Sequence, residues 1–328
     1  MNGFDAQWLL LCVMFVTAFG LWRFLRIAAP LGLMDRPNHR SQHVRETPVG
    51  AGIVSAITFA IGLWLTGSVT EYAVLPLQTF SVLVVGLAVV GLLDDRFHLP
   101  STPRLLAYFI ACGCVVYLGL PNMSMGLALG LIVFFTWHVN AYNFMDGLDG
   151  LAVTQALVVA SGMLLVTHFT PEVSTELPWI CALLIAALIP LWVINWPPAR
   201  VFMGDSGAVS MGLSLAIVAV VALRESLILF VVWWILMAPF LCDASATLLI
   251  RLMQGKAPHI AHREHAYQRL ARRSGSALTV NLALLAVHLV WQFPLVLAAL
   301  YSPQKAWIPV ILAPIPTLMV VAHLQRSA

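Results

Sequence analysis

Three clusters of carboxylate and carboxamide residues stand at the ends of long apolar runs. Their members are Asp94 and Asp95; Asn140, Asn143, Asp146 and Asp149; and Asp205, within the segment 202–207 of sequence FMGDSG. Ionisable groups at the edge of hydrocarbon are costly and usually mark a functional site. Their oxygens are also the hard ligands that suit Mg2+. We therefore expect the three clusters to share one divalent cation.

The spacing within the clusters favours metal binding over purely structural roles. Asp94 and Asp95 are neighbours, so one can act as a base while a metal holds the other. The three-residue step from Asn143 to Asp146 and Asp149 would place all three on one face of a helical turn. In the structural alternative, the pair ends a solvated helix and the second cluster is a Gly-rich turn that caps the next helix. That alternative explains one acid of the second cluster, not the whole set.

The loops around these clusters support the same interpretation. Gly147 and Gly150 would let the backbone bend sharply and approach a ligand. In the loop that starts at Asn195, Asp205 lies just before a predicted helix, where backbone N–H groups can hold phosphate oxygens. Phe202 can stack on a nucleobase. Alternatively, Asp205 is a helix N-cap and Phe202 is a membrane-interface anchor.

A basic segment, residues 256–273, adds groups that bind anions. Its histidines repeat every three residues, and its members of interest are His259, His262 and His265, with Lys256, Arg263, Arg269, Arg272 and Arg273. No cysteine or second ligand cluster accompanies the histidines, so a cationic pocket for phosphates fits better than a zinc site. The last three arginines are expected to face anionic lipid headgroups. Asp243, inside an apolar run, either orients this segment or binds substrate.

Composition identifies a polytopic membrane protein. The 328 residues are 61% hydrophobic and 9% charged, with a mean hydropathy of +0.92, whereas soluble domains carry about 25% charged residues. Apolar windows that fit a membrane span occur at 8–29, 49–67, 73–93, 104–120, 123–141, 151–169, 177–195, 206–223, 226–250, 277–300 and 306–324. We predict an all-α fold with about eleven transmembrane helices, ten being the alternative, in one membrane domain over residues 1–328.

The basic residues orient these spans. With the N-terminus outside, all lysines and arginines except Arg224 and Lys305 fall on the inner side, as the positive-inside rule requires. Every cluster described above then faces the cytoplasm, where nucleotide-activated donors are found. The first polar loop, 35–48, lies on the same side and offers Arg40 and His43 as further phosphate partners.

In this order the motifs resemble those of the polyprenyl-phosphate N-acetylhexosamine-1-phosphate transferases, the glycosyltransferase family 4 enzymes that include MraY, WecA and TagO. The resemblance covers nearly the whole chain. It implies transfer of an N-acetylhexosamine 1-phosphate from a UDP-sugar to undecaprenyl phosphate, with release of UMP and with Mg2+, or Mn2+, as cofactor. It also implies a bacterial inner-membrane protein among membrane lipids, with a periplasmic N-terminus, a cytoplasmic site, a possible homodimer and no nucleic-acid partner.

The resemblance further implies roles for individual residues. The expected catalytic residues are Asp94, Asp95, Asp205 and His262, with Asp94 as the base for the acceptor phosphate. The expected metal ligands are Asp94, Asp95, Asn143 and Asp205. The expected substrate contacts are Asn140, Asp146, Asp149, Asn195, Phe202, Arg263, His265 and Arg40. The spans 123–141 and 226–250 are expected to flank a groove for the lipid tail.

The histidine segment departs from the common family pattern. It reads HREHAYQRL from His262, which is closest to the WbpL-type branch. That branch starts O-antigen-type lipopolysaccharide chains with 6-deoxy sugars such as N-acetylfucosamine or N-acetylquinovosamine, so we expect such a sugar, with GlcNAc of the WecA or TagO type as the alternative. A transporter is the alternative from another class. Transporters place their sites near the bilayer midplane and often carry inverted repeats, whereas these acids lie at one face.

Overall fold

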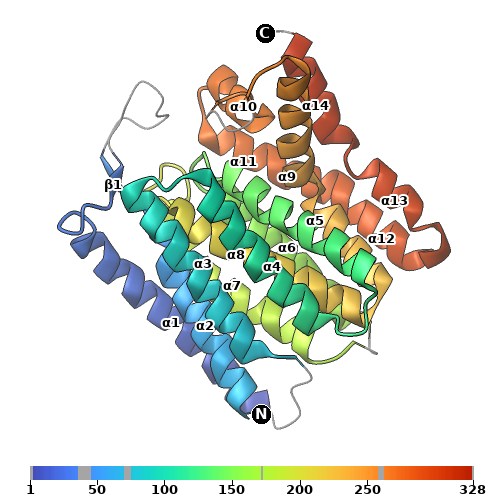
Figure 1. Cartoon of the computed structure of the whole chain (residues 1–328), viewed down its shortest axis with the longest axis horizontal. Helices are drawn as coiled ribbons and strands as arrows, with labels where there is room; N and C mark the ends of the chain where they lie inside the picture. The colour runs from blue at the N-terminus through green and yellow to red at the C-terminus, as the bar shows by residue number, and fades with distance from the viewer. Residues whose placement is uncertain (1–2, 36–45, 70–74, 171–172, 258–261, 327–328) are drawn as a thin grey trace.

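The computed structural model describes residues 3–35, 46–69, 75–170, 173–257 and 262–326, and these are mostly helical (Figure 1). The long helices are α1 (Gly3–Ile27), α2 (Gly52–Val69), α3 (Leu77–Phe97), α4 (Ser101–Gly119), α5 (Met125–Phe144), α6 (Leu151–His168), α7 (Glu176–Asn195), α8 (Gly204–Glu225) and α9 (Leu227–Met253). The C-terminal part holds α10 (Ala266–Ser274), α11 (Ala277–Val287), the π-helix η1 (His288–Gln292), α12 (Phe293–Tyr301), the 3₁₀-helix η2 (Pro303–Lys305), α13 (Trp307–Leu312) and α14 (Ile315–Arg326). Strands β1 (Met34–Asp35) and β2 (Thr47–Pro48) pair antiparallel.

Ten helical segments of the described chain are long and apolar enough to cross a membrane. Two are composite: residues 277–301 combine α11, η1 and α12, and residues 303–325 combine η2, α13 and α14. Helix α2 fills the remaining predicted window as a shorter apolar helix. The predicted all-α, polytopic membrane fold is confirmed, and each of the eleven windows contains a helix. The direction of insertion and the single-domain organisation stay predictions.

Helix α8 is the most buried of the spans, with 94% of its apolar window inside the protein. It packs against α2, α3, α4, α5 and α9. Small residues allow this closeness: a Cβ on Gly212 would come within 3.0 Å of the Val139 Cα in α5. In membranes, small residues let helix backbones approach and pack. The first residues of α8 therefore have a position fixed by several neighbouring helices.

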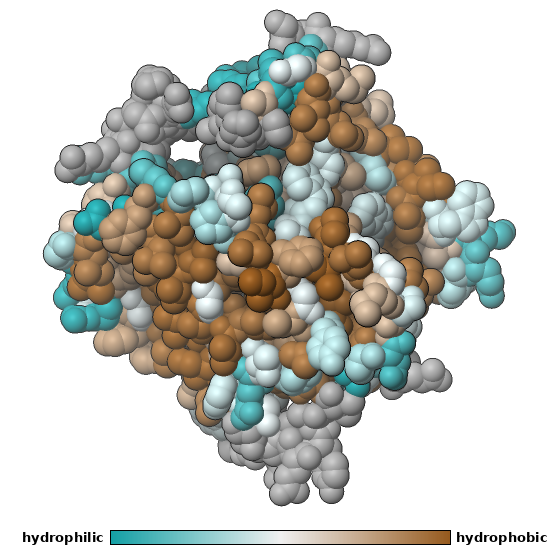
Figure 2. All heavy atoms as spheres, viewed as in Figure 1, coloured by the Kyte–Doolittle hydropathy of each residue, from teal (hydrophilic) through white to brown (hydrophobic). Residues whose placement is uncertain are grey.

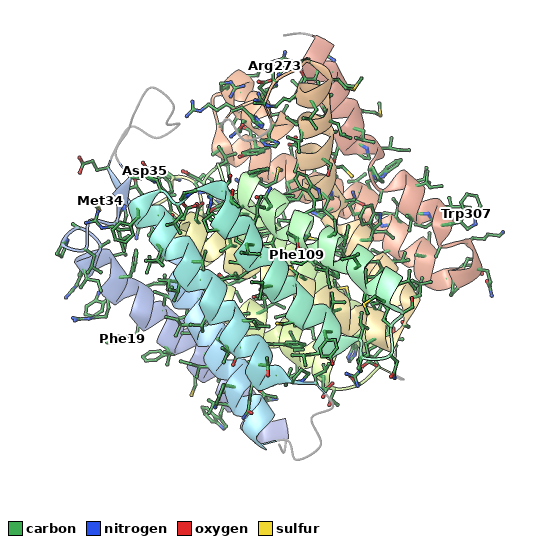
Figure 3. All side chains as sticks on the ribbon, in the orientation of Figure 1. Phe19, Met34, Asp35, Phe109, Arg273 and Trp307 are labelled. Atoms are coloured by element: carbon green, nitrogen blue, oxygen red, sulfur yellow. The ribbon has the colours of Figure 1, made fainter. Side chains whose placement is uncertain are left out.

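Polar and apolar surfaces are separated along the helices. Hydrophobic residues cover the middle of the visible face, and hydrophilic residues gather toward its upper and lower edges (Figure 2). In Figure 3, Asp35 in β1 and Arg273 in α10 both lie toward the upper end, whereas Phe19 and Trp307 lie on the flanks. Those two aromatic side chains are 55% and 62% exposed, as expected of lipid-facing residues. The polar clusters therefore lie at one end of a bilayer-embedded bundle.

Candidate active site

Asp95, near the end of α3, caps the start of α8. Its Oδ1 accepts a hydrogen bond from the backbone N–H of Asp205 at 2.8 Å, and its Oδ2 accepts one from Ser206 at 3.1 Å. The first N–H groups of a helix lack partners within the helix, and the helix dipole favours a negative charge there. The alternative interpretation of Asp205 as the N-cap of this helix is therefore wrong, because the Asp95 carboxylate accepts these N–H groups. The two N–H groups that were expected to hold phosphate are also occupied.

Glycines permit the close contact between α3, α8 and the loop before α2. A Cβ on Gly91 would lie 2.4 Å from the carbonyl oxygen of Asp205. Gly204 has a φ of +73°, and a Cβ there would lie 2.6 Å from the backbone nitrogen of Gly50. The same loop is joined to the segment before α8, because the N–H of Phe202 donates to Pro48 at 2.8 Å. Backbone contact thus fixes the position of Asp205.

Arg104, in the first turns of α4, lies between two of the predicted catalytic acids. Its Nη1 pairs with Oδ2 of the buried Asp94 and lies 3.6 Å from Oδ2 of Asp205. The other oxygen of Asp94 accepts the backbone N–H of Leu99 at 2.7 Å. Arg104 was not among the site residues predicted from the sequence. The available signal was the short connection between α3 and α4, which returns the start of α4 to the end of α3.

A polar cavity of about 600 Å³ opens beside these groups. Its charged lining residues include Asp35, Asp94, Asp95, Arg96, Arg104 and Asp205. Four carboxylates in one cavity would repel a phosphate group, so binding of an anionic substrate needs positive charge there. The two arginines supply part of that charge. A divalent cation would supply the rest.

The segment after α5 carries the second cluster. Helix α5 ends at Phe144, so Asn143 lies in its last turn and Asp146 and Asp149 lie in the following loop. The expectation that all three share one helical face is wrong, because the helix ends before the acids. Burial, with the nearby carboxylates of Asp95 and Asp149, raises the pKa of Asp146 well above its usual range. Asp146 therefore lies close enough to Asp95 to interact electrostatically with the first cluster.

Asp149 and Asn195 make structural hydrogen bonds in this region. The Asp149 carboxylate accepts the backbone N–H of Ala199 at 2.9 Å, and its carbonyl accepts the Asn281 side-chain amide at 2.8 Å. Asn195, 3% exposed, accepts from the N–H of Gly150 at 3.1 Å and donates to the Val201 carbonyl at 2.8 Å. These bonds join the loops before α6 and α8. Substrate contact by Asp149 and Asn195 stays a prediction.

The histidine segment leads into α10. The backbone N–H of Glu264 donates to Nδ1 of the half-buried His262 at 3.3 Å, and the His262 and His265 rings lie 4.8 Å apart. Burial, and then His265, lowers the pKa of His262 to about 4, so this imidazole is neutral near pH 7. Its protonated nitrogen is then Nε2, which can donate to an anion.

Ion pairs give the same segment a defined shape. Glu264 pairs with the buried Arg251, with Lys256 at 2.9 Å and with Arg269 at 3.6 Å. Arg269 also donates to the carbonyl oxygens of Glu264 and Leu324, both at 3.0 Å. The assignment of Arg269 to lipid headgroups is therefore wrong, because these internal partners hold its guanidinium.

Asp243 caps α10, which decides between the two alternatives left by the sequence. Its Oδ1 accepts the backbone N–H of Ala266 at 2.8 Å, and its Oδ2 accepts that of Tyr267 at 3.0 Å. The hydroxyl of Thr247 donates to the same carboxylate at 3.0 Å. Asp243 is 3% exposed, and its bonds orient the helix that follows His265.

The donor set fits Mg2+ as a partial site. In the described residues, no group of three His, Cys, Asp or Glu side chains is arranged to hold a metal. Mg2+ usually takes only one or two protein carboxylates and completes its shell with water and substrate phosphates. The Oδ1 of Asn143 is buried without a hydrogen-bond partner in the described part of the chain, and the Asp205 side chain is 35% exposed. The carboxylate oxygens of Asp94 and Asp95 already accept hydrogen bonds. Either residue could therefore bind a metal only through the remaining lone pairs of these oxygens.

The structure describes some of the remaining predicted residues, whereas others lie outside the described ranges. Asn140, Phe202 and Arg263 are half-buried near the site segments, and their contacts with substrate stay predictions. His265 is 3% exposed and lies against Tyr267, with ring centroids 5.9 Å apart. Arg40, with His43 and His259, lies outside the described residues. The structure thus brings the three acidic clusters together and places the start of α10 beside the second.

Comparison with known proteins gives consistent matches. The model of glycosyl transferase family 4 matches residues 77–223. The chain is 25% identical over 280 residues to a probable undecaprenyl-phosphate N-acetylglucosaminyl 1-phosphate transferase of Bacillus subtilis, covering 81% of this chain and 76% of that protein. It is 27% identical over 288 residues to the undecaprenyl-phosphate alpha-N-acetylglucosaminyl 1-phosphate transferase of Salmonella typhi, covering 80% and 76%.

The segment matched by the family model begins with α3 and ends within α8. It therefore holds Asp94, Asp95, the 140–152 stretch and Asp205, which are the groups that the fold brings together. The relatives match most of the chain, including regions outside that segment. The chain therefore has the all-α fold of a polytopic membrane protein, and it is similar over most of its length to undecaprenyl-phosphate N-acetylglucosaminyl 1-phosphate transferases.

Proposed function

We propose that the protein transfers an N-acetylhexosamine 1-phosphate from a UDP-sugar to undecaprenyl phosphate and releases UMP. The observation that carries this proposal is the polar cavity at the end of the spans, in which Arg104 lies between Asp94 and Asp205. A cavity at that level can receive a water-soluble diphosphate and a lipid phosphate together. The names of the relatives describe undecaprenyl-phosphate N-acetylglucosaminyl 1-phosphate transferases, which supports this acceptor and this type of donor.

The reaction joins the acceptor phosphate to the sugar-bearing phosphate. An oxygen of undecaprenyl phosphate attacks the phosphorus that carries the sugar, and the bond from that phosphorus to UMP breaks. Such transfers depend on alignment and charge neutralisation more than on covalent help from the protein. Mg2+, when bound, would neutralise the donor diphosphate, with Asn143 and Asp205 as its first proposed ligands. Asp94 would take a proton from the acceptor, and Arg104 orients Asp94 and Asp205 by contacting both carboxylates.

The histidine segment is proposed to hold the diphosphate. His262 is neutral near pH 7, so its Nε2–H would contribute a hydrogen bond. The guanidinium of Arg263 would contribute positive charge and several N–H donors. Other phosphoryl-transfer sites likewise use different groups to neutralise charge and to position the reactants.

The sugar is proposed to be a 6-deoxy-N-acetylhexosamine, such as N-acetylfucosamine or N-acetylquinovosamine, that starts an O-antigen-type chain. The support is the sequence HREHAYQRL after Ala261, which resembles the WbpL-type branch. GlcNAc is the second candidate, and the names of the relatives favour it. Both 6-deoxy sugars lack the C6 hydroxyl of GlcNAc, and N-acetylfucosamine also has the opposite configuration at C4.

The site is proposed to face the cytoplasm from a bacterial inner membrane. In that orientation nearly all arginines and lysines lie on the inner side, as the positive-inside rule requires. Asp35, which lines the polar cavity with Asp94, Asp95 and Asp205, lies toward the same end of the bundle as Arg273 in α10 (Figure 3). A UDP-sugar made in the cytoplasm would then reach the cavity directly.

Transfer from radiolabelled UDP-sugars to undecaprenyl phosphate tests this function. Purified protein in detergent is given UDP-GlcNAc, UDP-N-acetylfucosamine or UDP-N-acetylquinovosamine, with and without Mg2+. We expect a metal-dependent lipid product with one of these donors, and loss of that product in Asp205→Asn. Absence of product and of UDP-sugar binding, in folded protein, would refute the transferase function. A transporter would instead move substrate in vesicles with Asp205→Asn unchanged.

A further inference from the structure

Tyr267 joins two parts of the site that are distant in sequence. Its side chain is 4% exposed, and its hydroxyl donates a hydrogen bond to the carbonyl oxygen of Phe144 at 2.9 Å. Phe144 ends α5, directly after Asn143 and two residues before Asp146. The hydroxyl therefore holds the backbone between the proposed metal ligand Asn143 and the half-buried carboxyl group of Asp146.

Helix geometry explains why this carbonyl needs a partner. The last four carbonyl groups of an α-helix have no partner within the helix, and Phe144 is the last residue of α5. Burial raises the pKa of the Tyr267 hydroxyl, so the group stays protonated and able to donate. Tyr267 is itself fixed, because its backbone N–H donates to Asp243 at 3.0 Å. A continuous set of contacts therefore runs from α9 through α10 to the end of α5.

Gly147 makes room for this hydroxyl. A Cβ at position 147 would lie 2.2 Å from Oη of Tyr267, whereas the next atoms, in Gln268 and in the Tyr267 ring, would be 3.2 and 3.3 Å away. Gly150 has a positive φ of 72°, but Gly147 does not. The expected sharp bend therefore applies to Gly150. At Gly147, the absence of a side chain leaves space for the hydroxyl oxygen of Tyr267.

The same helix start carries the predicted phosphate-binding residues. His265 lies two residues before Tyr267, and its ring centroid is 6.1 Å from that of Phe144. The His262 ring lies 4.8 Å from that of His265. A shift of α10 relative to α5 would therefore separate the histidines from the segment that holds Asn143 and Asp146.

We propose that Tyr267 is a positioning residue for the transfer reaction. Its hydroxyl joins the segment 143–147 to the start of α10, so that Asn143 and Asp146 keep a fixed place relative to His262. The effect on transfer rests on the proposed function. The effect on the mobility of the segment does not, so the two can fail separately.

Three variants test the proposal: Tyr267→Phe, Gly147→Ala and the two together. Tyr267→Phe removes one oxygen and keeps the ring. Tyr301→Phe, at a side chain that is 90% exposed, removes a hydroxyl far from these contacts and serves as the control. Each protein is measured for hydrogen–deuterium exchange in residues 143–150, for melting temperature, and for the Mg2+ concentration that gives half-maximal transfer.

We expect Tyr267→Phe to speed exchange in 143–150 and to raise the half-saturating Mg2+ concentration roughly three- to tenfold, as one lost hydrogen bond would. Gly147→Ala should be more harmful alone than when combined with Tyr267→Phe, because the clashing oxygen is absent from the double variant. Equal costs of Gly147→Ala in both backgrounds would overturn the proposal. Unchanged exchange in Tyr267→Phe would overturn it whatever the activity. A lower melting temperature with unchanged Mg2+ dependence would overturn the positioning role and show a structural role only. If the wild-type protein transfers no sugar, the proposed function fails. Hydrogen–deuterium exchange in residues 143–150 still tests whether the Tyr267 hydroxyl holds this segment.

Discussion

Replacing Arg104 by alanine removes the cation that lies between Asp94 and Asp205. The guanidinium pairs with Asp94 and lies 3.6 Å from Asp205 Oδ2, while its own side chain is 27% exposed. Two like charges about 4 Å apart repel by roughly 4 kcal/mol at an effective dielectric constant near 20. Partial exposure reduces that figure, so we take a cost of about 2–3 kcal/mol for the uncompensated acids.

The added negative charge should weaken the binding of anionic substrates and strengthen the binding of a cation. The acceptor and donor phosphates would meet a more negative cavity, so transfer in Arg104→Ala should fall about 30- to 160-fold, since each 1.36 kcal/mol is about tenfold in rate. A divalent cation would meet the same negative charge and bind more tightly. The Mg2+ concentration for half-maximal transfer should therefore decrease even as turnover falls.

The assay is transfer to undecaprenyl phosphate over a Mg2+ titration, with three variants compared. Arg104→Lys keeps the charge without the two-pronged geometry and should fall between wild type and Arg104→Ala. Arg23→Ala, at an exposed residue of α1, should match wild type. An Arg104→Ala enzyme that keeps more than one third of the activity, or that needs more Mg2+ than wild type, would refute the reasoning.

Four further variants separate structural from chemical roles. Asn143→Ala should raise the half-saturating Mg2+ at least about tenfold without lowering the melting temperature, because its buried Oδ1 has no hydrogen-bond partner to lose among the residues that the structure describes; Asn195→Ala, which loses two loop contacts, should melt lower, and the reverse pattern would contradict both assignments. Asp243→Asn should lower stability by about 1 kcal/mol, as loss of a helix cap does, and speed amide exchange in α10; unchanged exchange would disprove the cap. In the folded protein the pKa of His262 is lowered from 6.5 to about 4. Its contribution to the free energy of unfolding is therefore complete above pH 6.5 and is lost as the pH falls toward 4. Between these pH values the melting temperature of His262→Gln should fall less than that of wild type, and an equal fall in both proteins would exclude this contribution.

The spans were predictable because one physical requirement fixes them. A segment that crosses hydrocarbon must be apolar and long enough, and both properties are readable in the sequence. The end of α5 was less predictable. The repeat of Asn143, Asp146 and Asp149 every three residues matches a helix, yet the helix ends at Phe144. Local turn chemistry around the glycines outweighed that periodicity.

The types of residue in the site were predictable, but their partners were not. A carboxylate that binds metal and one that caps a helix look identical in sequence, and Asp95 and Asp243 both cap helices that start far along the chain. The contact between Arg104 and Asp205 and the contact between Tyr267 and Phe144 were missed for the same reason. Their contacts depend on which helices are neighbours, and the order of apolar windows does not encode that arrangement.

The cap at α8 changes how phosphate binding must be understood. A free helix start is a ready anion site, and Asp205 seemed to mark one in the sequence. Asp95 occupies two of those N–H groups and adds a negative charge to the cavity. Under the proposed function, phosphates would therefore be held by other groups, which are Arg104 in the cavity and His262 and Arg263 in the segment that leads into α10. Under the same proposed function, two anionic substrates would meet only when those groups and a cation are correctly placed, and the proposed positioning role of Tyr267 follows from that requirement.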